Sequence, residues 1–222
     1  MLIGIEVSTV NPFLCATRMS DGMSRPTRFE LRARFDESTV RIYQAYAPRI
    51  AQPALEAGRF VAPFKFSRMT WIKPSFNWMM YRSGYATKRD QEVILGIDIL
   101  REGFEWALDH AVLSTFYPKI HISLNNWKKL LHKSPVRVQW DPERDWRIQI
   151  TDNVRTMQIG LSGEAVRRYV NEWITHIEDV TSLAHSVANH VLDGTTPTSR
   201  PDQFETIYPL RTDLIKRFTP RS

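Results

Sequence analysis

The chain has 222 residues, of which 42% are hydrophobic, so it can fold around a substantial core and bulk disorder is excluded. It contains no apolar run of about 18 residues, the length that a membrane-spanning helix requires, so no such helix is expected. Lys and Arg number 30 against 24 Asp and Glu, and the resulting net charge of +6 favours phosphate-bearing partners without excluding an ordinary basic surface.

Cysteine usage and the first residues favour a cytoplasmic location. Cys15 is the single cysteine and cannot form an internal disulfide, which fits a reducing compartment. Residues 1–16 carry Glu6 and lack a basic region, so they make a poor signal peptide. Polar residues, Gly and Pro are mixed over residues 1–36, and we expect this segment to form an arm that leads into a single domain over 37–194.

The domain opens with a strand and a helix. A short strand within 29–32 precedes a β-branched and aromatic run at 41–46, which predicts a second strand. Pro48 is placed to begin a helix, apolar residues recur after it at helical spacing, and Gly58 is placed to end it.

Further strands and helices complete an expected α+β fold with small, curved, mixed or antiparallel sheets. The clearest strand covers 92–99, and other strands are predicted at 136–141, 146–150 and 156–160. Short helical segments are predicted at 104–108 and, capped by Ser123, at 124–132. Between Ser162 and Gly194, apolar residues spaced by three or four predict one long C-terminal helix. Residues 195–222 are polar and interrupted by Pro, and we expect them to dock on the domain as an extension.

Missing motifs argue against several enzyme classes. The sequence has no G-x-x-x-x-G-K-[ST] loop, no G-x-G-x-x-G and no G-x-S-x-G, which argues against P-loop nucleotidases, standard Rossmann enzymes and α/β-hydrolases. One cysteine and no histidine pair spaced by four residues argue against a dedicated metal site.

Residues 69–85 combine aromatic rings, hydroxyl groups and fixed positive charges. Rings hold flat heterocycles by stacking, while cations and Ser hydroxyls bind phosphate and ribose oxygens. The segment therefore indicates a nucleotide or nucleic-acid site, whose candidate residues are Lys73, Ser75, Trp78, Tyr81 and Arg82. Core packing is the competing interpretation for each aromatic residue, but it is harder to apply to Lys73 and Arg82.

Residues 137–145 hold the candidate catalytic groups. In a strand, Gln139 and Asp141 lie on one face, where an amide and a carboxylate can hold a ribose hydroxyl and stabilise a developing cation. Asp141 followed by Pro142 fits a turn at a strand end equally well. Glu143 is the next candidate, and together with Asp141 it would also suit the acid and base of a nucleotide hydrolase.

Two resemblances rest on these motifs. Residues 40–82, 134–145 and 159–166 closely resemble a bacterial and fungal family catalogued as a domain of unknown function, and the match spans roughly 29–192. The order of the motifs also resembles the ADP-ribosyltransferase superfamily, especially the DarT toxins that modify nucleic acid. Tyr43-Gln44 stands where those proteins carry Tyr-His or a similar pair, and Gly58 ends the helix that follows.

The later superfamily motifs have counterparts here as well. Residues 71–81 resemble the aromatic, Pro-containing segment, 93–99 resemble the hydrophobic strand, and Gln139-Trp140-Asp141 stands where Gln-x-Glu carries the catalytic glutamate. Two positions depart from the pattern, because Gln44 replaces histidine or arginine and Asp141 replaces glutamate. Glu143 or Glu164 is the alternative carboxylate.

The resemblance implies an NAD-dependent ADP-ribosyltransferase that modifies nucleic acid or a nucleotide. Tyr43 and Gln44 would hold the ribose and the nicotinamide amide, and Asp141 would stabilise the oxocarbenium-like state. The pyrophosphate would face Arg59, Lys73 and Arg82. The alternative function is a non-catalytic nucleic-acid-binding module that uses the same rings and cations, and it predicts strongly salt-dependent binding.

Overall fold

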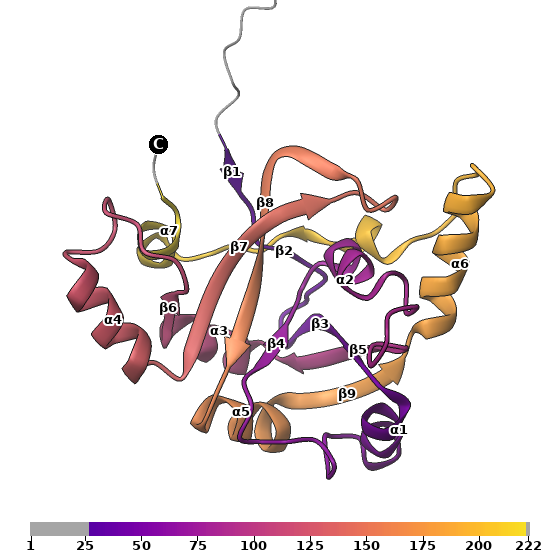
Figure 1. Ribbon diagram of the computed structural model, residues 1–222, viewed down its shortest axis with the longest axis horizontal. Helices are drawn as coiled ribbons and strands as arrows, with labels where there is room; N and C mark the ends of the chain where they lie inside the picture. Colours follow the sequence, from indigo (N-terminus) through magenta and orange to yellow (C-terminus); the bar gives the residue numbers. More distant parts are fainter. Residues whose placement is uncertain (1–26, 221–222) are drawn as a thin grey trace, which may run out of the picture.

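Two main sheets form the framework of the computed structural model, which describes residues 27–220 (Figure 1). In the larger sheet, β7 and β8 form a long antiparallel pair, β1 and β4 both pair with β8, and β6 pairs with β7. The strands of this sheet are β1 (Arg28–Phe29), β4 (Thr70–Ile72), β6 (Ala111–Leu113), β7 (Val136–Arg144) and β8 (Ile150–Leu161).

The second sheet is antiparallel, with the order β3-β5-β9, and consists of β3 (Thr39–Tyr46), β5 (Val93–Leu100) and β9 (Ile174–Asp179). It meets the larger sheet at one residue pair, because Tyr43 and Lys73 exchange two backbone hydrogen bonds of 2.7 and 3.3 Å. Beyond this pair no further backbone ladder joins β3 to β4 within the described residues. The two strands diverge there, and the divergence creates the candidate site.

Helices surround the two sheets, and local sequence signals explain several of their ends. Ser123 accepts a hydrogen bond from the Asn126 backbone N–H and caps α4, while Gly58 ends α1 with a φ of 66°, a conformation that glycine adopts without strain. The α-helices are α1 (Pro48–Ala57), α2 (Phe76–Ser83), α3 (Arg101–Asp109), α4 (Leu124–Lys133), α5 (Glu164–Arg168), α6 (Thr181–Leu192) and α7 (Thr212–Phe218). No helix within residues 27–220 has the length and apolar character needed to cross a membrane.

The prediction of one long helix from Ser162 to Gly194 is wrong. Helix α5 passes into a π-helical turn, η1 (Tyr169–Trp173), and the chain then forms β9, which pairs with β5, before α6 begins. The residues expected to face inward, Tyr169, Trp173 and Ile177, are all buried. Pairing with β5 provides backbone partners for a β-branched stretch, so tertiary context outweighs the helical spacing.

The other elements agree with the sequence more closely. The strand expected at 156–160 is part of a longer strand, β8, but the strand expected at 146–150 is wrong, because residues 146–149 form a turn in which Asp145 accepts the backbone N–H groups of Arg147 and Gln149. The described fold is therefore α+β with a curled mixed sheet, as expected.

The last elements return to the first strands. Strand β10 (Thr206–Ile207) pairs with β2 (Arg32–Ala33), and it follows the short 3-10 helix η2 (Pro201–Phe204). The Tyr208 N–H donates to the Leu31 carbonyl at 2.7 Å, and the Trp140 indole donates to the Phe218 carbonyl at 2.8 Å. The Glu205 carboxylate, just before β10, accepts the Phe76 N–H at 2.7 Å, and this bond places the segment next to the start of α2.

Candidate functional site

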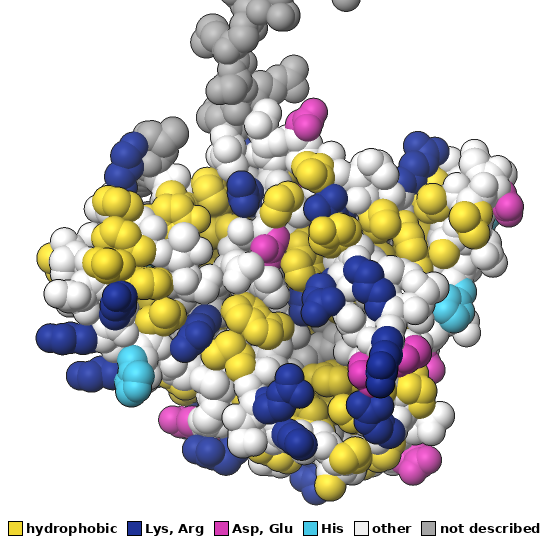
Figure 2. Space-filling view, viewed as in Figure 1, with side chains coloured by type: hydrophobic (Ala, Val, Ile, Leu, Met, Phe, Trp, Pro, Cys, Tyr) yellow, Lys and Arg dark blue, Asp and Glu magenta, His cyan; other side chains and the backbone are white. Residues whose placement is uncertain are grey.

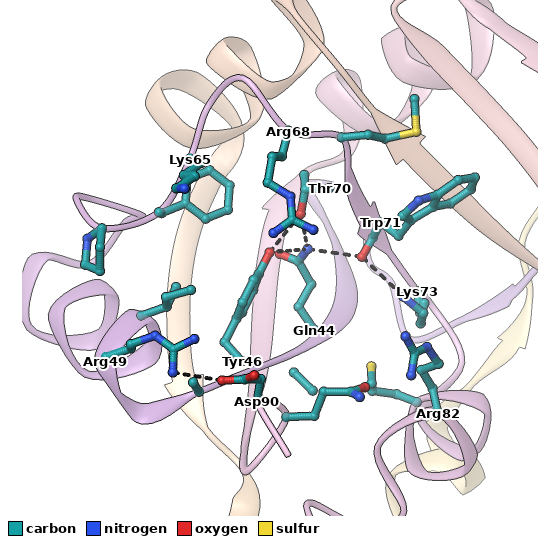
Figure 3. Close-up of a pocket in the computed structure, with 18 of the residues that line it drawn as sticks. Gln44, Tyr46, Arg49, Lys65, Arg68, Thr70, Trp71, Lys73, Arg82 and Asp90 are labelled. Atoms are coloured by element: carbon teal, nitrogen blue, oxygen red, sulfur yellow. Dashed lines mark hydrogen bonds and ion pairs between the residues drawn. The ribbon is translucent and has the colours of Figure 1, made fainter. Parts of the chain in front are cut away.

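A cleft of about 640 Å³ opens where β3 and β4 diverge (Figure 3). Its walls come from the end of β3, the start of α1, the loop before β4, helix α2 and residues 89–91. The lining contains six cationic side chains and one carboxylate, Asp90, which pairs with Arg49 at 2.8 Å. Figure 2 shows Lys and Arg side chains gathered around a hollow on this face. The cationic residues are Arg49, Lys65, Arg68, Lys73, Arg82 and Arg89.

Gln44 holds the floor of the cleft together. Its amide nitrogen donates to the Thr70 hydroxyl at 2.7 Å and to the Trp71 carbonyl at 3.0 Å, so this side chain spans the gap between β3 and β4. Its amide oxygen accepts the Tyr169 hydroxyl at 2.7 Å, and Tyr46 bonds to Thr70 at 2.8 Å. A buried network in which each member has a partner is rigid, and this one fixes the width of the cleft.

Lys73 is the unusual cation of the set. Its side chain is buried, with an exposed fraction of 7%, and its Nζ donates to the Trp71 carbonyl at a long 3.4 Å. Nζ also lies 5.2 Å from the centre of the Trp78 ring. Burial, with a further contribution from Arg82, lowers the pKa of Lys73 to about 7, although Asp141 acts in the opposite direction.

Asp141 lies on the same sheet face as Trp71. Its two carboxylate oxygens accept hydrogen bonds from the amides of Gln139 at 2.9 Å and Gln158 at 2.6 Å, and these two residues are paired across β7 and β8. The Trp71 ring packs against Gly160, where an added Cβ would lie 3.0 Å from the indole. The Asp141 carboxylate is held in one orientation by the two glutamine amides.

Ser75 and the start of α2 face away from the cleft, towards two other carboxyl groups. The Ser75 hydroxyl caps the helix at the Trp78 N–H and donates to Glu143 at 3.1 Å, and the Phe76 N–H donates to Glu205 at 2.7 Å. Burial raises the pKa of both carboxyl groups, and their proximity raises that of Glu205 further. Glu143 and Glu205 thus form a buried acidic pair, to which Ser75 is hydrogen-bonded, and none of these three residues lines the cleft.

The structure separates the remaining predicted residues. Tyr43 is buried edge-to-face against Phe76, and Trp78 is buried beneath Lys73. Tyr81 is partly exposed and stacks with the Arg144 guanidinium at 3.7 Å. Arg59 is exposed after α1 and does not line the cleft. Of the predicted ligand-binding residues, the cleft lining therefore contains Gln44, Lys73 and Arg82.

Several residues of the site were not predicted from the sequence. Arg49, Lys65, Arg68 and Arg89 come from loops and a helix start, where a single charge carries no periodic signal. Gln158 is detectable only once β8 is aligned against β7, which places it opposite Gln139. No group of three or more His, Cys, Asp or Glu side chains within residues 27–220 is arranged to hold a metal ion.

Comparisons with known proteins identify a family. No curated protein matches the chain. A family model described as Domain of unknown function (DUF4291) matches residues 30–207, which include the cleft, Asp141, the Glu143–Glu205 pair and every strand of the two main sheets except β1. Because this match covers most of the 222 residues, the chain belongs to the DUF4291 family.

Proposed function

We propose that the cleft binds NAD and that the protein transfers ADP-ribose to nucleic acid or to a nucleotide. One observation carries the proposal: a cation-lined cleft and a fixed carboxylate, Asp141, occupy one continuous face. Lys73 lines the cleft and is close enough to Asp141 for the carboxylate to influence its pKa, and Trp71, which also lines the cleft, lies on the same sheet face as Asp141. A dinucleotide requires this combination, with cations for the pyrophosphate and a negative charge near the ribose.

Each group has a distinct part in this proposal. Arg68 and Arg82 bind the pyrophosphate, because arginine presents several donors to phosphate oxygens. Asp141 stabilises the positive charge that develops on the ribose when the bond to nicotinamide breaks. Gln44 uses both ends of its amide within the protein, so it shapes the floor instead of binding the nicotinamide amide.

Thermal unfolding with and without NAD tests the binding step, because a ligand that binds only the folded state raises the melting temperature. Arg68→Glu places a negative charge in the cleft and should abolish the NAD-dependent shift. Arg59→Glu makes the same change of charge outside the cleft and should preserve it. Incubation with labelled NAD and a panel of DNA, RNA and nucleotides then identifies the acceptor. A shift that survives Arg68→Glu would contradict this location for the ligand.

A second candidate function is nucleic-acid binding without catalysis, and one arrangement favours it. Outside the cleft, Arg144 stacks on Tyr81 at 3.7 Å, and Trp146 has the guanidinium groups of Arg147 and Arg200 at 4.5 and 5.3 Å from its ring centre. Rings and cations placed together suit a single strand. This function predicts oligonucleotide binding that weakens steeply with salt and is indifferent to NAD.

A further inference from the structure

Two lysines of the cleft have opposite environments. Lys65 is exposed, whereas Lys73 is enclosed by β4 and α2 at an exposed fraction of 7%. A charged ammonium group has three N–H donors and normally keeps water or carboxylates around it. Within the described residues, the Lys73 amine has one hydrogen bond, the 3.4 Å contact to the Trp71 carbonyl.

This geometry suits an uncharged amine better than an ammonium ion. A neutral amine has two N–H groups and one lone pair, so a single weak donated bond leaves little unsatisfied and leaves the lone pair free. The charged form would bury two unsatisfied donors, which is costly.

The charged groups around Lys73 come from each element that packs against it. Arg82 on α2 opposes protonation, and Asp141 on β7 favours it from beyond hydrogen-bond distance. Arg68 and Arg49 line other walls of the same cleft. The surroundings thus lack a close anion that would fix the proton on Nζ, while the Trp78 ring provides an apolar wall on one side.

We propose that Lys73 is the general base of the transfer reaction, a role that rests on the function proposed above. As the acceptor atom forms its bond to the ribose C1′, the bond from C1′ to the nicotinamide nitrogen breaks and its electron pair leaves with nicotinamide. The acceptor's proton moves to the Lys73 lone pair. The resulting ammonium ion loses this proton to water after the product leaves.

Three variants distinguish a base from a phosphate-binding cation. Lys73→Met removes both properties, whereas Lys73→Arg retains a positive charge but provides no basic nitrogen at accessible pH. A general base predicts that kcat falls on the order of 100-fold in both variants. Lys65→Met, as the matched cleft control, should raise KM while leaving the pH profile of kcat in place. A phosphate-binding role predicts instead that Lys73→Arg restores the rate, and this result would overturn the proposal.

Two further measurements complete the test. The wild-type kcat should rise with pH through an inflection near 7, and this inflection should be lost in Lys73→Met, whose activity added small amines should partly restore. NMR titration of the Lys73 side chain measures the protonation of its amine in the absence of turnover, and Lys65 provides the comparison. NAD binding with wild-type kcat in folded Lys73→Met would overturn the base role alone. Absence of any NAD binding by the wild-type protein would instead overturn the proposed function and this role with it.

Discussion

The loop from Lys73 to Phe76 separates two buried ionisable regions that differ in how their polar atoms are satisfied. On the cleft side, the Lys73 amine has one long hydrogen bond. On the other side, Glu143 accepts bonds from the Ser75 hydroxyl and the Arg144 N–H, and Glu205 accepts the Phe76 N–H. Burial favours the neutral form in both regions. The acidic pair is hydrogen-bonded into the fold, whereas the Lys73 amine keeps only one weak bond, and this difference is the reason for proposing a chemical role for Lys73 and a structural one for the acidic pair.

A fully paired buried charge provides the reference for this comparison. Arg41 is buried and forms two bonds to Asp98, at 2.6 and 2.8 Å, and a further ion pair with Glu178. The Arg41→Leu substitution leaves Asp98 and Glu178 without their cationic partner and should lower the free energy of unfolding by about 3 kcal/mol, as for other broken buried pairs. Urea unfolding measures the loss, and the exposed Arg59→Leu serves as the control. An unchanged midpoint would contradict a stabilising role for these ion pairs.

Asp141 and Glu143 test the division between the two regions most directly. Asp141→Asn should lower NAD turnover on the order of 100-fold, because it removes a fixed negative charge beside the reacting ribose. Its stability should change little, since the Asn oxygen can still accept from one glutamine amide, and the other amide can turn over so that its oxygen accepts from the Asn NH2 group. Glu143→Gln should lower NAD turnover less than Asp141→Asn does, and its main effect should be on the stability of the fold. Steady-state kinetics and thermal melts of both variants check the assignment, which equal losses of turnover would contradict.

Lys73→Met should stabilise the protein even as it inactivates it. The folded state lowers the pKa of Lys73 to about 7, so the unfolded state binds more protons above that pH, and wild-type stability should rise with pH towards 10. Removing the amine abolishes this dependence and should add on the order of 2 kcal/mol at pH 7, as when buried charges are replaced by apolar groups. Denaturant unfolding from pH 7 to 10 provides the measurement. A destabilised variant with the same pH slope as the wild type would argue that Lys73 remains charged when folded.

Glu205→Gln should produce the smallest change, and its pH dependence has the opposite sign. Because the folded state raises the pKa of Glu205, the folded protein binds more protons than the unfolded chain above the ordinary carboxyl pKa. Wild-type stability should therefore fall as pH rises through this window. The Gln side chain keeps an oxygen for the Phe76 N–H and needs no proton, so the melting temperature at pH 7 should rise by about 2–4 °C, equivalent to ~1 kcal/mol. A lower melting temperature at all pH values would indicate that Glu205 is needed as an anion.

Local signals in the sequence account for much of the fold and for part of the site. Pro48 and Gly58 mark the ends of α1, and the run at 92–99 marks β5, because these signals act through the backbone of neighbouring residues. Lys73 and Arg82 were found because they lie in a segment of unusual composition, whereas Gln44 was named through the family resemblance. Strand β9 was missed because its partner, β5, is far away in the sequence, and apolar spacing alone cannot show that a strand edge needs pairing.

The assignment of roles within the site needed contacts that the sequence does not encode locally. Ser75 lies two residues from Lys73, yet its hydroxyl faces Glu143 on the opposite side of the loop. Tyr81 was expected to bind the cofactor but stacks with Arg144, which belongs to a strand more than 60 positions later. The hydrogen bond from the Tyr85 hydroxyl to the Trp146 carbonyl joins the same two parts of the chain, at a sequence separation of 61. Composition indicated that a site existed, and only the fold showed which side chains share it.

The bond between Glu205 and the start of α2 also bears on how the protein is made. Residues near 76 leave the ribosome long before residue 205, and strand β2 must likewise wait for β10. Until then the first N–H group of α2, that of Phe76, lacks its carboxyl partner, and the loop that carries Lys73 lacks the segment that packs beside it. Completion of the cleft therefore has to wait until residue 205 has been synthesised, and a chain that stalls before Glu205 would lack the carboxyl partner of the Phe76 N–H beside the loop that carries Lys73.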